Sequence, residues 1–211
     1  MPASNDSVAV DHIGMLQESG GYRYITTYYD RFSGFAVSRP VRCIDALTTA
    51  FTFMNAWVTM FGAPNSLLSD NGSDFRSELF GHLTKQLPIE RKFTTSYNAG
   101  CNGAVERYNK TRKTALRAIS IAKDTDFSCG NGWHLYVPYI NSITNSRKSR
   151  RTQYKLSPAE IFLGRSPQTP IDFKLFGLES VQKKSGGSKY AEFNLQSACI
   201  ILSNSLIFFI K

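Results

Sequence analysis

The amino-acid sequence predicts an α/β protein in which helices pack on a β-sheet. Short segments rich in β-branched and aromatic residues alternate along the chain with longer segments whose apolar residues recur at helical spacing. Strands that alternate with helices favour such a layered fold. The chain has 211 residues, of which 42% are hydrophobic, and this is enough for one domain with a buried core.

The first three expected elements are strands. Residues 7–14 form a short strand that runs into Asp11. Residues 22–30 and 35–41 are rich in aromatic and β-branched side chains and are joined by Arg-Phe-Ser-Gly, so they are expected to form a hairpin.

A helix is expected from Ile44 to Phe61. Its apolar residues at helical spacing are Leu47, Phe51, Met54, Trp57 or Val58, and Phe61. Gly62 and Pro64 follow directly and are typical of a helix end.

Strands and helices continue to alternate after this point. Residues 66–70 predict a brief buried strand with Asp70 at its carboxyl end. The next expected elements are a helix at 77–87, a strand at 89–95 and, after a glycine-containing loop, a long helix at 104–122.

The carboxyl-terminal part is expected to extend this core. Residues 133–146 favour a helix, and Ser157 is placed to cap another short one. We therefore divide the chain into a core at 1–125, a helical and basic extension at 126–182, and a linker with an atypical apolar tail at 183–211, for which we expect little order.

Positive charge is concentrated in one part of the chain. The formal net charge is +9, and the segment from Arg107 to Lys155, with eleven Lys and Arg residues against two acids, accounts for all of it. One basic segment on a neutral body indicates a polyanion-binding surface, because neutralising phosphates releases their counterions. A solvated helix face is the alternative explanation. No apolar run is long enough to cross a membrane, no secretion signal opens the chain, and the cysteines and histidines lack zinc-site spacing.

Three acidic residues occupy informative positions. Asp11 and Asp70 lie at the carboxyl ends of expected strands, where α/β sheets place their sites, and Glu106 opens the long helix. Singly, each has an ordinary explanation as a strand-end, turn or first-turn residue. Brought together, they would repel one another unless cations lay between them, and hard oxygen ligands favour Mg²⁺ or Mn²⁺. Two such ions are the usual clamp for in-line phosphoryl displacement.

The sequence blocks around these acids follow one another in a characteristic order. Thirty-five residues, 71–105, separate Asp70 from Glu106. The chain contains, in order, VDHIGML, YITTYYDRFSGFAVSRPV, FGAPNSLLSDNGSDFRSELF, NGAVERYNKTRK and LSPAEIFLGRSPQTPID. Over about residues 8–177 it resembles the catalytic core of retroviral and LTR-retrotransposon integrases of the Ty3 type.

The resemblance implies an RNase H-like α/β fold: a mixed five-stranded sheet flanked by helices, with a helical carboxyl-terminal extension. It implies a metal-dependent polynucleotidyl transferase that trims donor DNA ends and then joins the freed 3′-hydroxyl to target DNA. By position, Asp11, Asp70 and Glu106 would be catalytic and would hold two Mg²⁺ or Mn²⁺ ions, with no zinc. The expected partners are double-stranded DNA and further copies of the chain, with no membrane, and the expected location is the nucleus.

The long helix carries a polar stripe that supports DNA binding. The stripe begins at Glu106 and continues in cations, because its members step by three or four residues, while apolar residues lie largely on the opposite side. Such a stripe would lay a DNA backbone towards the metal ions. Tyr97 and Asn102, in the loop before this helix, match family positions near the donor DNA end. The candidate DNA contacts are therefore Tyr97, Asn102, Asn109, Lys110, Lys113 and Arg117.

Two other functions of the same fold remain open. One is a catalytically silent or element-derived DNA-binding module, and the other is a nuclease that hydrolyses DNA without joining it. The zinc domain and the basic β-barrel that usually flank this core are not expected within this sequence. Among the other residues, Asp30 and Asp74 are expected to be turn and surface acids, and Trp133 and Tyr136 to be core aromatics.

Overall fold

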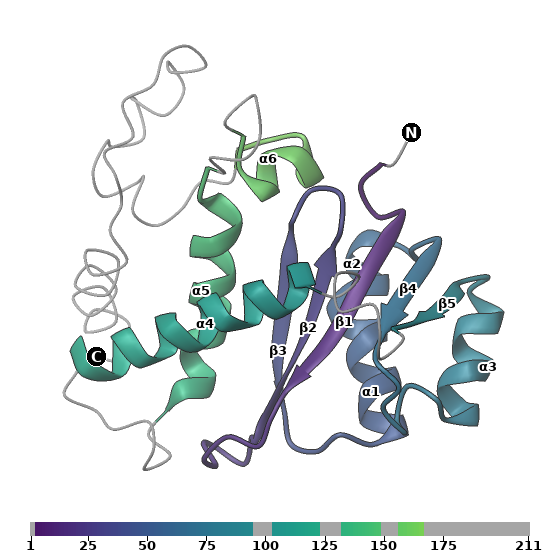
Figure 1. Ribbon diagram of the computed structural model, residues 1–211, viewed down its shortest axis with the longest axis horizontal. Coiled ribbons are helices and arrows are strands. Elements are labelled where there is room, and N and C mark those ends of the chain that lie inside the picture. The colour runs from purple at the N-terminus through teal and green to yellow at the C-terminus, as the bar shows by residue number, and fades with distance from the viewer. Residues whose placement is uncertain (1–2, 95–102, 123–131, 149–155, 167–211) are drawn as a thin grey trace.

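The computed structural model describes residues 3–94, 103–122, 132–148 and 156–166 (Figure 1). The strands are β1 (Ser7–Ile13), β2 (Tyr24–Asp30), β3 (Ala36–Val41), β4 (Ser66–Ser69) and β5 (Glu90–Phe93). The helical elements are α1 (Ala46–Phe53), the π-helical turn η1 (Met54–Val58), α2 (Thr59–Phe61), α3 (Glu78–Gln86), α4 (Gly103–Ala122), α5 (Trp133–Ser146) and α6 (Pro158–Leu163). The boundaries expected near 125 and 182, and the tail at 183–211, lie outside the described residues and stay predictions.

The five strands form one mixed sheet in the order β3-β2-β1-β4-β5. β1, β2 and β3 pair antiparallel, whereas β4 pairs parallel with both β1 and β5. The expected hairpin and the mixed five-stranded sheet are confirmed. The position of Asp11 at a strand end is wrong: it lies inside β1, opposite Thr27 of β2, because β1 continues to Ile13 along β2 after its pairing with β4 has ended at Ala9.

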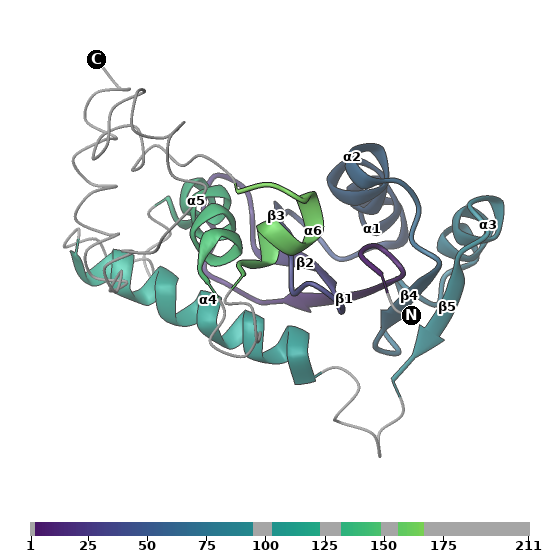
Figure 2. The same ribbon diagram turned by 90° about the horizontal axis from the view of Figure 1, so that it is seen from above.

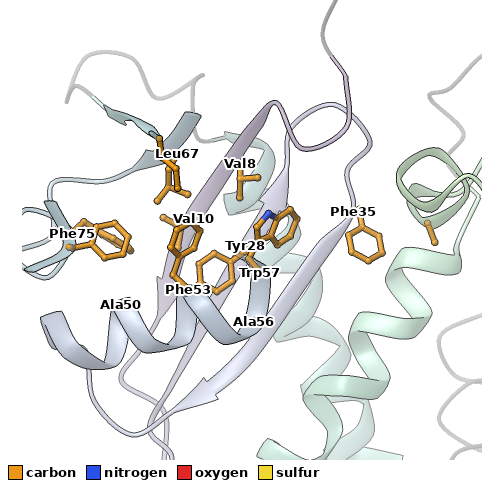
Figure 3. Packing of buried hydrophobic residues seen from close by; sticks show 13 residues of the cluster. Val8, Val10, Tyr28, Phe35, Ala50, Phe53, Ala56, Trp57, Leu67 and Phe75 are labelled. Atoms are coloured by element: carbon orange, nitrogen blue, oxygen red, sulfur yellow. The ribbon is translucent and has the colours of Figure 1, made fainter. Parts of the chain in front are cut away.

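Helices cover both faces of the sheet (Figure 2). On one face, α1, η1 and α3 pack over a core of aromatic and aliphatic side chains, part of which is shown in Figure 3. The largest contributors to this core are Val8, Val10, Tyr28, Phe35, Phe53, Trp57, Leu67, Phe75 and Phe80. This core holds together the part of the sheet from which Asp11 and Asp70 project.

The segment expected to be one helix from 44 to 61 is α1, η1 and α2 in succession. The Thr59 N–H bonds to the Met54 carbonyl, five residues back, so the helix widens to a π turn before Gly62 ends it with φ +85°. The expected apolar face is wrong at its start, since Leu47 and Phe51 are 69% and 68% exposed. Successive residues turn by about 100°, so Phe51 lies on the side away from Phe53, which faces the sheet.

On the opposite face, α4 and α5 pack against the sheet. Val105 of α4 joins a small cluster with Ala9 and Leu68, which lie two residues before Asp11 and Asp70 in the sequence. Further along, Leu116 packs in a second cluster that includes Trp133, Tyr136 and Val137 of α5. Trp133 and Tyr136 are buried, which confirms them as core aromatics. Helix α4 is thereby fixed along the sheet with its first turn beside β1.

Two acids expected on the surface are buried, and that expectation is wrong. Asp30 is fully buried and accepts hydrogen bonds from the backbone N–H groups of Asn5 and Ser33 and from the Ser33 hydroxyl. Asp74 is 6% exposed and bonds to the Thr49 hydroxyl and to His12. In both cases donors replace the water that burial removes, so the carboxylate can be accommodated inside.

The expected cap at Ser157 is confirmed. The Ser157 hydroxyl accepts the Glu160 N–H, and the Glu160 carboxylate accepts the Ser157 N–H, which together form a capping box. Within the part of the chain that the structure describes, no helix combines the length and the apolar character needed to span a membrane.

Candidate metal centre and nucleic-acid interface

The parallel pairing of β1 with β4 brings Asp11, inside β1, near Asp70, the residue directly after β4. In the parallel ladder between β1 and β4, Ala9 is paired with Leu68, and each aspartate lies two residues further along its own strand direction. Side chains two residues apart point to the same face of a sheet, and neighbouring strands are about 4.8 Å apart. Asp11 therefore shares with Ala9 the face that α4 covers, and Asp70 directly follows the neighbouring strand.

The environment of Asp11 changes its acidity. Burial raises the pKa of Asp11, the hydrogen bond from Asn109 opposes this, and the negative charge of Asp70 raises the pKa further. The contribution of Asp70 to the pKa of Asp11 indicates that the two carboxylates lie near each other. A divalent cation at this place would offset both the lost hydration and the repulsion.

Glu106 approaches Asp11 from the first turn of α4. Both acids line one pocket of about 270 Å³, whose lining residues are Asp11, His12, Ile13, Glu106, Asn109, Lys110 and Lys113. The pocket therefore combines two carboxylates with two lysines from the polar stripe of α4. Asp11 therefore takes part in two pairs of acids. It lies near Asp70, and it lines the same pocket as Glu106.

The three carboxylates do not meet at one point. Among the described residues, no group of three or more His, Cys, Asp or Glu side chains is close enough to hold an ion jointly. The donor set is nevertheless of the type that suits Mg²⁺ or Mn²⁺, because it consists of carboxylate oxygens and its only imidazole, that of His12, is engaged elsewhere.

Asn109 fixes the orientation of Asp11. Its Nδ2 donates to Asp11 Oδ2 at 2.7 Å, and its Oδ1 accepts from the Thr27 hydroxyl at 3.0 Å. The other oxygen of Asp11, Oδ1, accepts the backbone N–H of His12 at 2.9 Å. Asn109 is only 5% exposed, so both ends of its amide are used inside the protein. Its contact with DNA stays a prediction.

The cations of the stripe lie on the outer side of α4. Lys110, Lys113 and Arg117 are all exposed, and the first two line the pocket beside Asp11. In Figure 2, α4 lies on the side of the sheet opposite α1 and α3. Tyr97 and Asn102 lie outside the described residues, and their proposed DNA contacts stay predictions.

A hydrogen-bonded group behind the site was not expected from the sequence. His12 bonds through Nδ1 to the Thr26 hydroxyl and through Nε2 to Asp74 Oδ2, both at 3.0 Å, and its ring stacks on Phe75. Burial alone would raise the pKa of Asp74, but His12 and the Thr49 hydroxyl together hold it below its ordinary value. The group ties β1 to the turn after β4, and thus the backbone of Asp11 to that of Asp70. The alternation of side chains along a strand could have predicted that His12 lies behind the site, because it places His12 on the face of the sheet opposite Asp11.

The raised pKa of Asp11 predicts a pH-dependent stability. Between the ordinary value of 3.8 and the raised value, the folded state binds more protons than the unfolded state. The free energy of unfolding contributed by this group therefore falls as pH rises through that window. Asp11→Asn, which lacks the charge, should gain stability relative to the natural protein over the same window and keep the gain at neutral pH.

Urea unfolding of both proteins in a metal-free buffer with a chelator, from pH 3.5 to pH 7, measures this difference. Comparing the two proteins cancels the titration of all other acids. A difference in unfolding free energy that stays constant across the range would contradict a raised pKa for Asp11.

Some proteins of known type resemble this chain in sequence, and others resemble it in fold. No protein-family model matches the chain. The Pol polyprotein from transposon 412 of Drosophila melanogaster is 25% identical over 195 residues, or 92% of this chain, and the Gag-Pol polyprotein of koala retrovirus is 31% identical over 147 residues, or 70% of it. The chain spans only 15% and 8% of the lengths of these two relatives.

Solved structures decide the fold family. The catalytic core domain of HTLV-2 integrase, solved in complex with magnesium, matches 76% of this chain and 97% of its own with a TM-score of 0.60 at 17% identity. The catalytic core domain of BIV integrase matches with a TM-score of 0.58 at 21% identity, over 76% of this chain and 95% of its own. The chain is a retroelement Pol homologue with an integrase core fold.

The integrase core fold confirms the resemblance and the RNase H-like class expected from the sequence. The homologues are Pol polyproteins of both retroviruses and transposons, which agrees with a retroelement origin. Within this integrase core fold, the three acids lie in β1, directly after β4 and in the first turn of α4. Residues far apart in sequence therefore lie close to the two inner strands β1 and β4.

Proposed function

We propose that this chain is the metal-dependent polynucleotidyl transferase core of a retroelement integrase, which trims DNA ends and joins them to target DNA. One observation carries the proposal: Asp11 lies close enough to Asp70 for their charges to interact, and it shares with Glu106 a pocket that two lysines also line. The Pol homologues and the integrase core fold support the same function.

The acids would hold the metal ions. Asp11, Asp70 and Glu106 offer hard carboxylate oxygens and no sulfur, so Mg²⁺ or Mn²⁺ fits them, and two ions suit an arrangement in which Asp11 belongs to two pairs. When bound, the ions would activate the attacking water or 3′-hydroxyl and neutralise negative charge at phosphorus. The HTLV-2 core was solved with magnesium, which supports a divalent cation in this fold.

The other residues of the site would bind and orient. Asn109 holds Asp11 Oδ2 and leaves the lone pairs that remain on the carboxylate for a ligand. Lys110 and Lys113 would bind DNA phosphates next to the pocket and place a phosphodiester beside the acids. The reaction needs no covalent protein nucleophile, since water or the 3′-hydroxyl attacks the phosphorus atom directly.

The proposed partners are double-stranded DNA and further copies of the chain, acting in the nucleus. One similar solved structure is an intasome of simian T-cell lymphotropic virus, and the HTLV-2 core was solved in a trimeric form. In this chain, Leu47 and Phe51 present exposed apolar surface on the outer side of α1, on the sheet face away from α4. An apolar surface of this kind is suited to self-association, and it would leave α4 free for DNA.

A joining assay tests the proposed function against its two alternatives. Labelled duplex donor ends and an unlabelled target are incubated with the protein and Mg²⁺ or Mn²⁺, and trimmed, nicked and joined products are separated by length. Joined products support the proposed function. Nicked products alone would favour a hydrolysis-only nuclease, and salt-sensitive DNA binding without any cleavage would favour a silent DNA-binding module.

The lysines of α4 should set the salt dependence of DNA binding. Each phosphate neutralised by a lysine contributes about −0.9 to the slope of log affinity against log salt concentration. Lys110→Ala and Lys113→Ala should each make the slope shallower by about 1 and weaken binding similarly for all sequences. Fluorescence anisotropy of a labelled duplex at several salt concentrations measures both quantities.

Lys85→Ala is the matched control for these two variants. Lys85 is also an exposed helical lysine, but it lies in the last turn of α3, on the other face of the sheet. Its removal should leave the slope unchanged. A slope that depends on Lys85 as much as on Lys110 and Lys113 would show that general charge, and not the α4 stripe, binds DNA.

A further inference from the structure

Arg112 is a fully buried cation on the inner side of α4. Its Nη1 donates to the Thr27 hydroxyl, and its Nη2 donates to the Tyr108 hydroxyl and to Asn141 Oδ1, each at 2.8 Å. The guanidinium also lies over the Tyr108 ring, 4.7 Å from its centre. Its Nε has no hydrogen-bond partner, and none of the ion pairs among the described residues includes Arg112.

Burying the charged guanidinium of Arg112 costs free energy that a residue with only a packing role would not need to spend. Arg112 lies on the same side of α4 as Val105 and Leu116, which are seven residues before and four residues after it and are both buried. An apolar side chain at position 112 would continue that side without the cost of removing a cation from water. The arginine is therefore expected to have a task that an apolar residue cannot perform.

The hydrogen bonds of Arg112 form a relay that ends at Asp11. A guanidinium only donates, so the Thr27 oxygen must accept from Arg112, and it also accepts from the Ser38 hydroxyl at 3.0 Å. With both lone pairs used, the single proton of Thr27 is directed to Asn109 Oδ1. This fixes which end of the Asn109 amide is the oxygen, and the Nδ2 end then faces Asp11 Oδ2.

We propose that Arg112 and Thr27 are positioning residues for Asp11, acting through the orientation of the Asn109 amide. The inference rests on the proposed function, in which Asp11 holds a metal ion. Without the relay, the Asn109 amide can rotate and present its oxygen to the Asp11 carboxylate, which repels it. Partners behind a metal ligand typically change metal affinity by about 10- to 100-fold when they are removed.

Arg112 also joins α4 to α5 through Asn141, so a purely structural role has to be separated from positioning. Thr27→Val removes the relay hydroxyl while keeping the shape of the side chain, and Thr27→Ser restores the hydroxyl. Asn141→Ala removes the bond to α5 and the bond from Asn141 to the Ser38 carbonyl, but leaves the relay intact. The dispersion of the amide NMR spectrum verifies that each variant is folded.

Two measurements on these variants test the proposal. In the metal-free protein, NMR reports the exchange of the Asn109 side-chain amide protons with water; these protons should be protected in the natural protein, Thr27→Ser and Asn141→Ala, and lose protection in Thr27→Val. Calorimetric titration with Mn²⁺ should show an affinity about 10- to 100-fold weaker for Thr27→Val, with Thr27→Ser and Asn141→Ala close to the natural protein.

The proposal would be overturned if Thr27→Val kept the amide-proton protection and the Mn²⁺ affinity of the natural protein. It would also be overturned if Asn141→Ala lost both properties as strongly as Thr27→Val. If the natural protein binds no Mn²⁺ at all, the proposed function and the role towards the metal fail together. The amide exchange measured without metal still decides in that case whether the relay orients Asn109.

Discussion

Asp70→Asn is expected to reduce the joining of DNA ends about a thousandfold or more while leaving the protein folded. Asp70 is exposed, and its Oδ1 accepts only the Gly72 N–H, a bond that the oxygen of asparagine can also accept. The fold should therefore tolerate the change. Losing one anionic metal ligand removes several kcal/mol of transition-state stabilisation, and each 1.36 kcal/mol of barrier corresponds to a factor of ten in rate. The joining assay with Mn²⁺ measures the rate, and thermal unfolding monitors the fold.

Glu106→Gln should lower the rate to a similar degree, and Glu78→Gln provides its control. Both glutamates are exposed and occupy the first turn of a helix, Glu106 in α4 and Glu78 in α3. Any general effect of the helix dipole is therefore similar in the two variants. Full joining activity of Glu106→Gln, or an equal loss in Glu78→Gln, would refute the assignment of Glu106 to the metal centre.

Trp57→Ala should lower the free energy of unfolding by about 3–5 kcal/mol, which is a large part of the total of about 5–15 kcal/mol for a typical domain. Trp57 is fully buried in the core over β1 and β2, next to Tyr28 and Phe35 (Figure 3). Its indole Nε1 also donates to Asn5 Oδ1 at 2.8 Å, so both packing and a hydrogen bond are lost. Chemical denaturation followed by circular dichroism measures the change.

Leu47→Ala is the control for this prediction. Leu47 belongs to the same helical segment, but 69% of it is exposed, so its truncation should change the stability of the monomer by no more than about 0.5 kcal/mol. If Leu47→Ala destabilises the protein as much as Trp57→Ala, then either the outer side of α1 is buried in an oligomer or the core is not where the structure places it. Sedimentation of the natural protein distinguishes these two results.

The strands and helices were predictable because their signals are local. The β-branched residues of 22–30 and 35–41, the glycine after Phe61 and the serine at 157 each specify an element by their own chemistry. The face that a helix buries was less predictable, since apolar residues of α1 lie on both sides. Phe53 and Trp57 are buried because they pack against Tyr28 of the sheet, whereas Phe51 is exposed. The sequence pattern of the helix alone does not distinguish these residues.

The three acids of the proposed site were selected by their order and spacing, but their surroundings could not be predicted from the sequence. That Asp11 lies inside β1 depends on how far β1 and β2 stay paired, a property of two distant segments. The burial of Asp74 likewise depends on His12 and Thr49, and the relay from Arg112 depends on Thr27 in another strand. Hydrogen bonds between side chains far apart in sequence leave no periodic signal in the chain.

We propose that Asp11, with Asp70 on one side and Glu106 on the other, forms a divalent-cation site beside the lysines of α4. Crystals of the protein soaked in Mn²⁺ and measured by anomalous diffraction test this site most directly. We expect anomalous density in contact with Asp11 together with Asp70 or Glu106. Well-occupied Mn²⁺ sites on other residues, with none touching Asp11, would contradict it.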